Sequence, residues 1–465
     1  MKKIIFSISL AAALLCAADG YSQVVVDAEV EVGGIKPMNA VNNGPKMAKK
    51  SQTRSNYEAY KAAGFPYARL HDAPIWYNWG HTVDVSCVFP DFDADENSPA
   101  SYDFTLTDKL LSDIQSTGTK VFYRLGQSIE HWGKKYGANP PKDYKKWSRI
   151  CEHIVRHYNE GWADGFRYGI EYWEIWNEPD LGFRAGRHLR GDSPTWNGTD
   201  KDYFRLYEIT ARHLKKCFPS IKVGGPALCE DNEWADNFLA YVSSKKLPLD
   251  FFSYHLYAGT VKQFVEKNRL MKSLLDKYGY GSAEMILDEW NYLANWTDEF
   301  VYTMEVIVSH KGAAFASAIM QASQDGPADM LMYYDARPST GFNGLFDDTT
   351  DATLPAYYSL YSWKKLRALG TQVRSDVGGL EDIYVTAAKS SADGRLSILV
   401  TYYTDNKEKV APISIDLDVR GFDIKESVGF VTDKYKLHTE TPVAFTDGRT
   451  TLSLLPNSYI FIELR

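Results

Sequence analysis

Cysteine is scarce in this chain, with five residues among 465. None of them lies in a C-x-x-C pattern or shows the Cys/His spacing of a metal site, so the sequence predicts neither a zinc module nor a metal cofactor. Cys87, Cys151, Cys217 and Cys229 follow the first apolar run. Four cysteines allow three pairings, and we expect single thiols rather than a disulfide framework.

The chain also lacks a long basic block, and its net charge is -8. A phosphate backbone would be repelled over most of such a surface, which argues against nucleic acid as a partner. Repeats, proline-rich linkers and low-complexity segments are missing as well. We therefore expect folded domains that pack closely.

One apolar run, residues 4–18, follows Lys2 and Lys3 and precedes small or polar residues. This is the layout of a secretory signal peptide, and the run is too short to span a bilayer comfortably. We predict a signal peptide at residues 1–22 and an exported protein, periplasmic or extracellular. Cys16 would anchor the chain to a membrane only if lipidated, and residues 13–15 lack the small residue expected just before such a cysteine.

Short β-leaning runs alternate with segments of helical period, which indicates βαβ units around a parallel sheet. The predicted strands are 35–39, 67–71, 120–125, 171–177, 222–225, 251–257, 285–290 and 330–335. The predicted helices are 55–63, 105–116, 144–159, 202–217, 234–244, 261–277, 299–322 and 355–369. Eight such units close into a (β/α)8 TIM barrel, here residues 33–369, whose chemistry lies at the carboxyl ends of the strands.

Beyond residue 369 the pattern changes to alternating apolar and polar residues broken by turns. This pattern predicts a C-terminal β-sandwich over residues 370–465. Residues 23–32 alternate in the same way and would add an edge strand to it. The fold class is therefore α/β, with a TIM barrel followed by a sandwich.

An acidic residue closes the fourth predicted strand, where residues 173–180 read WEIWNEPD. Pro179 cannot extend a ladder, so the strand ends at Glu178 and presents it at the barrel mouth. Burial of this carboxyl group between Trp173 and Trp176 would disfavour its ionised form, as a general acid requires. The amide of Asn177 suits a sugar hydroxyl.

A second acidic residue, Glu289, closes the seventh predicted strand, where residues 285–291 read MILDEWN. Strands four and seven face each other across a barrel mouth. Two carboxyl groups about 5 Å apart are what double displacement at a glycosidic bond requires. Strand alternation would turn the neighbouring Asp288 to the opposite side from Glu289.

Together these segments resemble glycoside hydrolase family 39, the family of β-xylosidases and α-L-iduronidases, within the clan of retaining (β/α)8 glycoside hydrolases. The resemblance covers residues 30–370 and is carried further by IKPMN at 35–39, RLHD at 69–72, DFFSYHLY at 250–257 and DEWN at 288–291. It implies the following roles: Glu178 as acid/base, Glu289 as nucleophile, Asn177 on the hydroxyl beside the anomeric carbon, His255 on another hydroxyl, Tyr257 and Arg69 on Glu289, and His71 as a further sugar contact.

The resulting hypothesis is a retaining hydrolase of plant-type oligo- or polysaccharides, exo-acting and similar to β-xylosidases. The alternatives are an arabinose- or galactose-releasing enzyme, a uronide-specific glycosidase, an endo-glycanase, or a polysaccharide-binding protein without catalysis. No cofactor is predicted, because carboxyl groups alone can supply both proton transfer and nucleophilic attack.

Two sets of loop residues bear on the choice of sugar. The loop after Glu178 is rich in cations that suit a carboxylate on a sugar, or that simply pair with nearby acids in solvent: Arg184, Arg187, His188 and Arg190. Several aromatic residues follow predicted strands and could stack on sugar rings: Trp76, Tyr77, Trp79, Trp132, Trp196 and Trp296.

Overall fold

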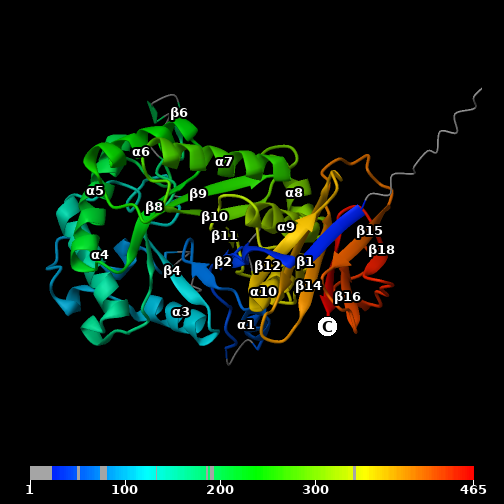
Figure 1. Cartoon of the computed structure of the whole chain (residues 1–465). Helices are drawn as coiled ribbons and strands as arrows, with labels where there is room; N and C mark the ends of the chain where they lie inside the picture. The colour runs from blue at the N-terminus through cyan, green and yellow to red at the C-terminus, as the bar shows by residue number, and fades with distance from the viewer. Residues whose placement is uncertain are drawn as a thin grey trace, which may run out of the picture.

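The computed structural model describes residues 23–49, 53–73, 81–131, 133–184, 187–188, 193–338 and 342–465. The predicted signal peptide and Cys16 lie outside these residues. A barrel surrounded by helices and a separate curled sheet stand side by side (Figure 1). Among the described helices, none is long and apolar enough to cross a membrane.

Within the described residues, eight parallel strands close into a barrel in the order β10-β11-β2-β3-β4-β5-β8-β9. Their bounds are β2 Ala40–Asn42, β3 Tyr67–Arg69, β4 Lys120–Leu125, β5 Tyr172–Ile175, β8 Lys222–Leu228, β9 Phe251–Ala258, β10 Glu284–Tyr292 and β11 Met330–Tyr333. Each strand pairs with its successor in the chain, which confirms the predicted TIM barrel.

The first barrel strand is β2 and not the predicted 35–39. Pro37 interrupts that segment and cannot donate to a ladder. Its neighbour Lys36 bonds to helices instead: its amide donates to Gln324 Oε1 at 2.8 Å, and its carbonyl accepts from Trp363 Nε1 at 3.0 Å. The strand therefore begins three residues beyond the proline.

Helices cover the outside of the barrel. They are α1 Tyr57–Ala63, α2 Val85–Val88, α3 Thr105–Ser116, α4 Tyr144–Asn159, α5 Asp200–Cys217, α6 Asn232–Lys245, α7 Val261–Lys277, α8 Phe300–Ile307, α9 His310–Gln324 and α10 Pro355–Leu369, with short 3-10 turns at Pro99–Ser101 and Trp162–Asp164. Capping boxes start α5 at Thr199 and α7 at Thr260, since each hydroxyl accepts from the amide three residues on. The predicted helix 299–322 is two helices, because the Ser309 side chain caps α9.

The barrel interior changes character along the strands. Apolar side chains fill the amino-terminal half: Ala40, Phe122, Tyr172, Phe251, Ile286, Met330 and Met332. Two positions farther along five of these strands, strand alternation brings fully buried polar groups to the same inward face: Asn42, Arg124, Glu174, Ser253 and Asp288. The carboxyl end of the barrel is thus a polar chamber on an apolar floor.

The prediction that Asp288 points away from Glu289 is wrong. Asp288 Oδ2 lies 2.9 Å from Arg69 Nε inside the barrel, and Glu289 also contacts Arg69. The register of β10 against β9 shifts between Leu287 and Glu289. Such an irregularity breaks the two-residue alternation, so consecutive acidic side chains both face inward.

The second body is a sheet of nine described strands, in the order β17-β16-β19-β14-β13-β12-β1-β15-β18. Their bounds are β1 Gln23–Gly34, β12 Thr371–Asp376, β13 Ile383–Lys389, β14 Leu396–Tyr402, β15 Ile413–Arg420, β16 Ser427–Thr432, β17 Thr439–Thr441, β18 Arg449–Leu454 and β19 Ser458–Leu464. The amino-terminal strand β1 is internal, antiparallel to β12 and parallel to β15, rather than at the predicted edge. Its alternate residues Val24 and Val26 are fully buried.

The sheet packs against α9 and α10 of the barrel (Figure 1). Thr401 Oγ1 of the sheet lies 2.7 Å from both Ser317 Oγ and Gln321 Nε2 of α9. Asp405, just after β14, accepts from Lys311 Nζ at 2.6 Å and from the Tyr292 hydroxyl at 2.9 Å. Because Tyr292 ends β10, the sheet directly supports the strand that carries Glu289.

Candidate active site

Glu178 stands in a tight turn directly after β5. Trp176 and Glu178 both have left-handed backbone angles, with φ of 78° and 46°. Side-chain-bearing residues adopt such angles only when the surroundings impose them. Here the Glu178 amide donates to the Ala227 carbonyl at 2.9 Å, and Thr195 Oγ1 donates to the Glu178 carbonyl at 2.7 Å. The turn thereby holds the Glu178 carboxyl group at the chamber.

The surroundings of Glu178 favour its protonated form. Its side chain is buried, with 7% of the residue exposed, and burial raises the pKa of this carboxyl group to about 7. His255 Nδ1 lies 2.7 Å from Glu178 Oε1. Burial lowers the pKa of His255 to about 4, so this imidazole is uncharged at neutral pH and does not hold Glu178 ionised.

Trp173 does not line this carboxyl group as the sequence suggested. Tyr172 and Glu174 face the barrel interior, so alternation turns Trp173 outward, where its ring stacks on Tyr123 with centroids 5.0 Å apart. Trp176 is also buried, and its Nε1 donates to the Thr195 carbonyl at 2.8 Å. The two tryptophans therefore help to build the turn and the helix layer.

Glu289 has a different environment. Arg69 Nη1 lies 2.7 Å from its Oε1, and the Tyr257 hydroxyl donates to its Oε2 at 2.9 Å. Burial raises the pKa of Glu289, while the Arg69 cation opposes the rise. Facing oxygens of Glu289 and Glu178 lie within 4.8 Å of each other, with His255 Nδ1 within the same distance of both.

Arg69 connects the two carboxyl groups to the layer beneath them. Its Nε contacts Glu174 at 2.7 Å and Asp288 at 2.9 Å, and its Nη2 donates to Asn177 Oδ1 at 2.6 Å. One cation thus faces three buried carboxyl groups. Burial and the negative charge of Glu174 raise the pKa of Asp288 well above its ordinary value, which favours its protonated form.

The bond from Arg69 also orients the amide of Asn177. Because Oδ1 accepts from the guanidinium, Nδ2 is the donor left over. Among the described residues it has no hydrogen-bond partner, although it is fully buried. A buried amide donor without a partner, one residue from Glu178, suits a ligand hydroxyl.

His71, the further sugar contact predicted from the sequence, follows β3 and is buried in the same chamber. Its Nε2 lies 3.9 Å from Glu289 Oε1, and its Nδ1 has no hydrogen-bond partner in the described part of the chain. Burial lowers the pKa of His71 well below its ordinary value, so it is a neutral ring. The structure thus brings all seven predicted residues into one chamber, where His255 Nδ1 lies against Glu178.

Comparison with known proteins identifies the family of the chain. Residues 42–299 match the sequence profile of glycosyl hydrolases family 39. The chain belongs to this family. Over 211 residues it is 31% identical to a β-xylosidase of Geobacillus stearothermophilus, and the matched segment covers 42% of this chain and 36% of that protein. A β-xylosidase of Caldicellulosiruptor saccharolyticus is 29% identical over 209 residues, or 42% and 37% of the two chains. The matches thus span little more than a third of these curated relatives.

Solved structures show the same fold over nearly the whole length of this family 39 chain. A glucosidase from Croceicoccus marinus superimposes with a TM-score of 0.77 at 20% identity and covers 96% of this chain and 98% of its own. A monomeric β-xylosidase from Caulobacter crescentus CB15 superimposes with a TM-score of 0.70 at 16% identity, covering 95% and 99%. The barrel and the C-terminal sheet therefore recur together.

The candidate site also contains one supporting residue that the sequence analysis missed. Asp180, two residues after Glu178, accepts backbone hydrogen bonds from Cys229, Glu230 and Asp231 at 2.8, 3.0 and 3.0 Å. These bonds hold the loop after β8 beside Glu178, and burial raises the pKa of Asp180 to about 6. An acidic residue that follows Glu-Pro gives no sequence signal for this role, because its partners are backbone amides 49 to 51 residues away.

A hollow of about 390 Å³ opens beside His255 and Tyr257 and includes Cys229, Lys267 and Trp296 in its lining. Trp296 is 59% exposed and stands 5.7 Å from the Tyr257 ring, as a sugar-stacking residue would. Trp196 is fully buried against Trp176 and cannot stack on a ligand, contrary to the sequence interpretation. Trp76, Tyr77, Trp79 and Trp132, and the side chains of the arginine-rich loop, lie outside the described part.

Glu178, His255 and Glu289 also place one nitrogen and two oxygens within 4.8 Å of one another, close enough for a divalent cation. The Arg69 guanidinium already bonds Glu289 there and would repel such an ion. The arrangement is better suited to moving a proton and attacking carbon than to holding a metal.

Proposed function

We propose that this chain hydrolyses glycosidic bonds with net retention of configuration at the anomeric carbon. The observation that carries the proposal is the pair Glu178 and Glu289, whose facing oxygens lie within 4.8 Å. Carboxyl groups of retaining enzymes stand about 5–5.5 Å apart, whereas inverting enzymes need about 6.5–9.5 Å to admit a water molecule. The short separation favours direct attack by one carboxylate.

In the first step, Glu289 is the nucleophile. One of its oxygens bonds to the anomeric carbon as the glycosidic C–O bond breaks, and Glu178 passes its proton to the departing oxygen. Arg69 and Tyr257 orient the Glu289 carboxylate through their hydrogen bonds, and the Arg69 cation opposes the rise that burial causes in its pKa. The pKa of about 7 keeps a useful fraction of Glu178 protonated at neutral pH.

In the second step, Glu178 acts as a base. It takes a proton from water, the water oxygen bonds to the anomeric carbon, and the bond to Glu289 breaks. The charge of Glu178 raises the pKa of Glu289, and the repulsion between two carboxylates this close acts on both of them. Because Glu289 is a neutral ester in the intermediate, this repulsion is absent and the pKa of Glu178 falls, as its new role requires.

For the substrate, we propose an exo-acting, β-xylosidase-like activity on plant-type oligosaccharides. Support comes from the two relatives named as β-xylosidases. A third relative, named as an α-1,4-L-rhamnosidase from Formosa agariphila, is 25% identical over 125 residues and makes α-L-rhamnosides a second substrate class to examine.

The test uses the full chain on a panel of aryl glycosides: β-D-xyloside, α-L-rhamnoside, α-L-arabinofuranoside, β-D-galactoside and a uronide. The anomer released first by the best substrate is read by proton NMR before mutarotation. Retention supports the proposal, whereas an inverted product contradicts double displacement. Preference for another glycoside would overturn the xyloside assignment alone, and no cleavage of any member by the folded parent would overturn the activity.

We also propose export, on the strength of the basic start and apolar run of residues 1–18. Expression of the full chain followed by cell fractionation and amino-terminal sequencing tests this. A product beginning near residue 23 outside the cytoplasm agrees with the proposal, whereas an uncleaved cytoplasmic product contradicts it.

A further inference from the structure

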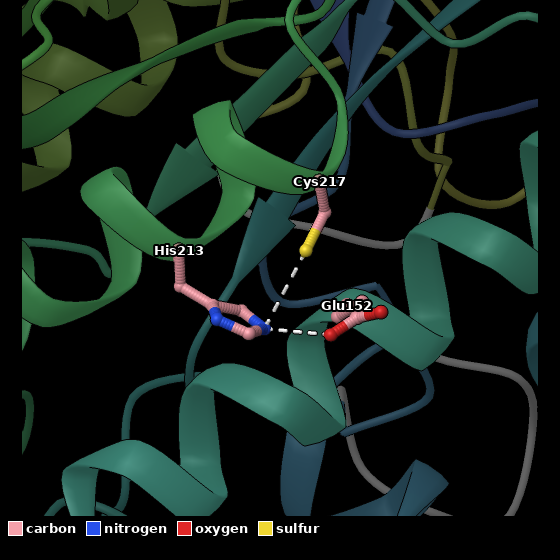
Figure 2. Close-up of side chains that lie close together, drawn as sticks. All are labelled: Glu152, His213 and Cys217. Atoms are coloured by element: carbon pink, nitrogen blue, oxygen red, sulfur yellow. Dashed lines mark hydrogen bonds and ion pairs between the residues drawn. The ribbon is translucent and has the colours of Figure 1, made fainter.

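Three side chains meet between two neighbouring helices on the outside of the barrel (Figure 2). Glu152 comes from α4, and His213 and Cys217 come from consecutive turns of α5. His213 Nε2 lies 2.6 Å from Glu152 Oε2 and 3.9 Å from Cys217 Sγ, and all three ligand atoms lie within 4.8 Å of one another. Each side chain is half-buried, so solvent can still reach the cluster.

The spacing on α5 is that of a chelating pair. Residues four apart lie on the same helix face, one turn above the other, so His213 and Cys217 present a nitrogen and a sulfur to the same point. The sequence analysis did not recognise the pair, because the third ligand is 61 residues away on another helix. Only the packing of α4 against α5 brings Glu152 to it.

One carboxylate oxygen of Glu152, Oε2, faces His213 Nε2 inside the cluster. Arg156 binds its other oxygen, Oε1, at 2.7 Å and leaves Oε2 directed at His213 and Cys217.

We propose that Glu152, His213 and Cys217 form a binding site for a borderline-soft divalent cation of the zinc type. Sulfur, imidazole nitrogen and carboxylate oxygen are the three ligand classes that zinc takes. Three protein ligands leave a fourth tetrahedral position, which water fills from the exposed side.

Binding rearranges protons in a defined way. Cys217 releases its proton to solvent and binds as the thiolate, and a neutral His213 carries its proton on Nδ1 so that Nε2 can bind. The ligand atoms then surround the ion at about 2.0–2.3 Å. The hydrogen bond between His213 and Glu152 breaks, Nε2 and Oε2 separate from 2.6 Å to about 3.3 Å, and Cys217 Sγ approaches by a small side-chain rotation. Arg156 stays on Glu152 Oε1 and orients the carboxylate from outside the ion's shell.

The ion would connect the helix before β5 to the helix after it. Glu178 follows β5 directly, but the cluster lies on the helix layer and contacts no catalytic group. We therefore expect an effect on stability by mass action and no effect on the chemical step.

The test is titration of the chelator-treated full chain with Co²⁺, whose thiolate bond absorbs in the near ultraviolet, followed by competition with Zn²⁺. One equivalent should produce the thiolate-to-cobalt band, and Zn²⁺ should displace it. Affinity should rise about tenfold per pH unit while the thiol is protonated, because one proton leaves Cys217. Activity on the best aryl glycoside should be unchanged at one equivalent.

Variants identify the ligands. Cys217→Ser should abolish the band, and His213→Ala and Glu152→Gln should each weaken binding by more than about 10–100-fold, the usual cost of losing an outer-shell partner alone. Cys87→Ser is the matched control, since Cys87 is also half-buried but lies on α2, and it should bind as the parent does.

The proposal is overturned if the parent shows no band, or if the band persists in Cys217→Ser. It is also overturned if one equivalent of metal inhibits the parent and Cys217→Ser equally, because the ion would then occupy Glu178, His255 and Glu289. The activity proposed above does not depend on any of these results.

Discussion

The two sides of the chamber surround their carboxyl groups with different partners. On the β10 side, Glu289 receives a cation and a hydroxyl donor, from Arg69 and Tyr257. On the β5 side, Glu178 has a neutral imidazole 2.7 Å away and a pKa raised to about 7 by burial. The comparison teaches that two buried carboxyl groups within 4.8 Å of each other differ through their immediate neighbours, which is what the proposed roles of nucleophile and acid require.

The largest expected loss of activity follows removal of the carboxyl group of Glu289, the proposed nucleophile. Glu289→Ala should reduce kcat by roughly 10⁴-fold or more, because no group remains to form the covalent intermediate. Azide fits the space beside Arg69 and should restore cleavage of an activated aryl glycoside, with a glycosyl azide of inverted configuration identified by NMR.

Glu284→Ala is the matched control for this experiment. It removes a carboxylate from the other end of β10, where Glu284 binds Lys222 at 2.6 Å. It should leave the kinetics unchanged. Turnover by Glu289→Ala close to that of the parent would contradict the assignment.

The next largest effect concerns the acid side. Glu178→Ala should reduce kcat/KM by about 10²–10⁴-fold on substrates with poor leaving groups and much less on activated ones. Parent activity should decline as pH rises through about 7, because the protonated carboxyl group is the active form in the first step, and this decline should vanish in the variant.

Azide again distinguishes the two sides. In Glu178→Ala it should attack the intermediate on Glu289 and yield a glycosyl azide of retained configuration. If the two alanine variants gave azides of the same configuration, the roles of the two glutamates would be wrong.

A third effect is on stability. Because the pKa of Glu178 is raised in the folded state, the folded chain binds more protons than the unfolded chain between about pH 4.5 and 7, and stability falls as pH rises through this window. Glu178→Gln removes the buried charge and should increase the free energy of unfolding above pH 7 by up to about 3 kcal/mol. Urea unfolding at pH 4 and pH 8 tests this, and an equal effect at both values would contradict it.

The smallest expected effect concerns the contact between Tyr257 and Glu289. Tyr257→Phe removes one hydrogen bond to Glu289 and should reduce kcat/KM by about 10- to 100-fold, the value of a hydrogen bond to a charged group. Tyr254→Phe is its control on the same strand, because that hydroxyl donates to Asn268 at 2.7 Å instead. The control should lose about 1 kcal/mol of stability and keep its kinetics, and equal kinetic losses in both variants would count against a role for Tyr257.

Local sequence patterns predicted much of the framework. The bounds of α3, α4, α7, α10 and β4 agree with the sequence analysis, because amphipathic period and strand alternation are properties of short segments. The positions of Glu178 and Glu289 near the carboxyl ends of their strands were also readable, although β10 continues to Tyr292, three residues beyond Glu289. The catalytic roles of these residues stay predictions until the variants are measured.

What local patterns could not predict depends on contacts between distant segments. A register shift on β10 turned Asp288 inward, alternation along β5 turned Trp173 outward, and pairing on both sides placed β1 inside its sheet. The sequence by itself thus determined which residues stand at the barrel mouth. Only the tertiary structure decided their pKa values and ion pairs. Burial, the contact of Arg69 with Glu289 and the neutral state of His255 all arise when strands far apart in the chain close into one chamber.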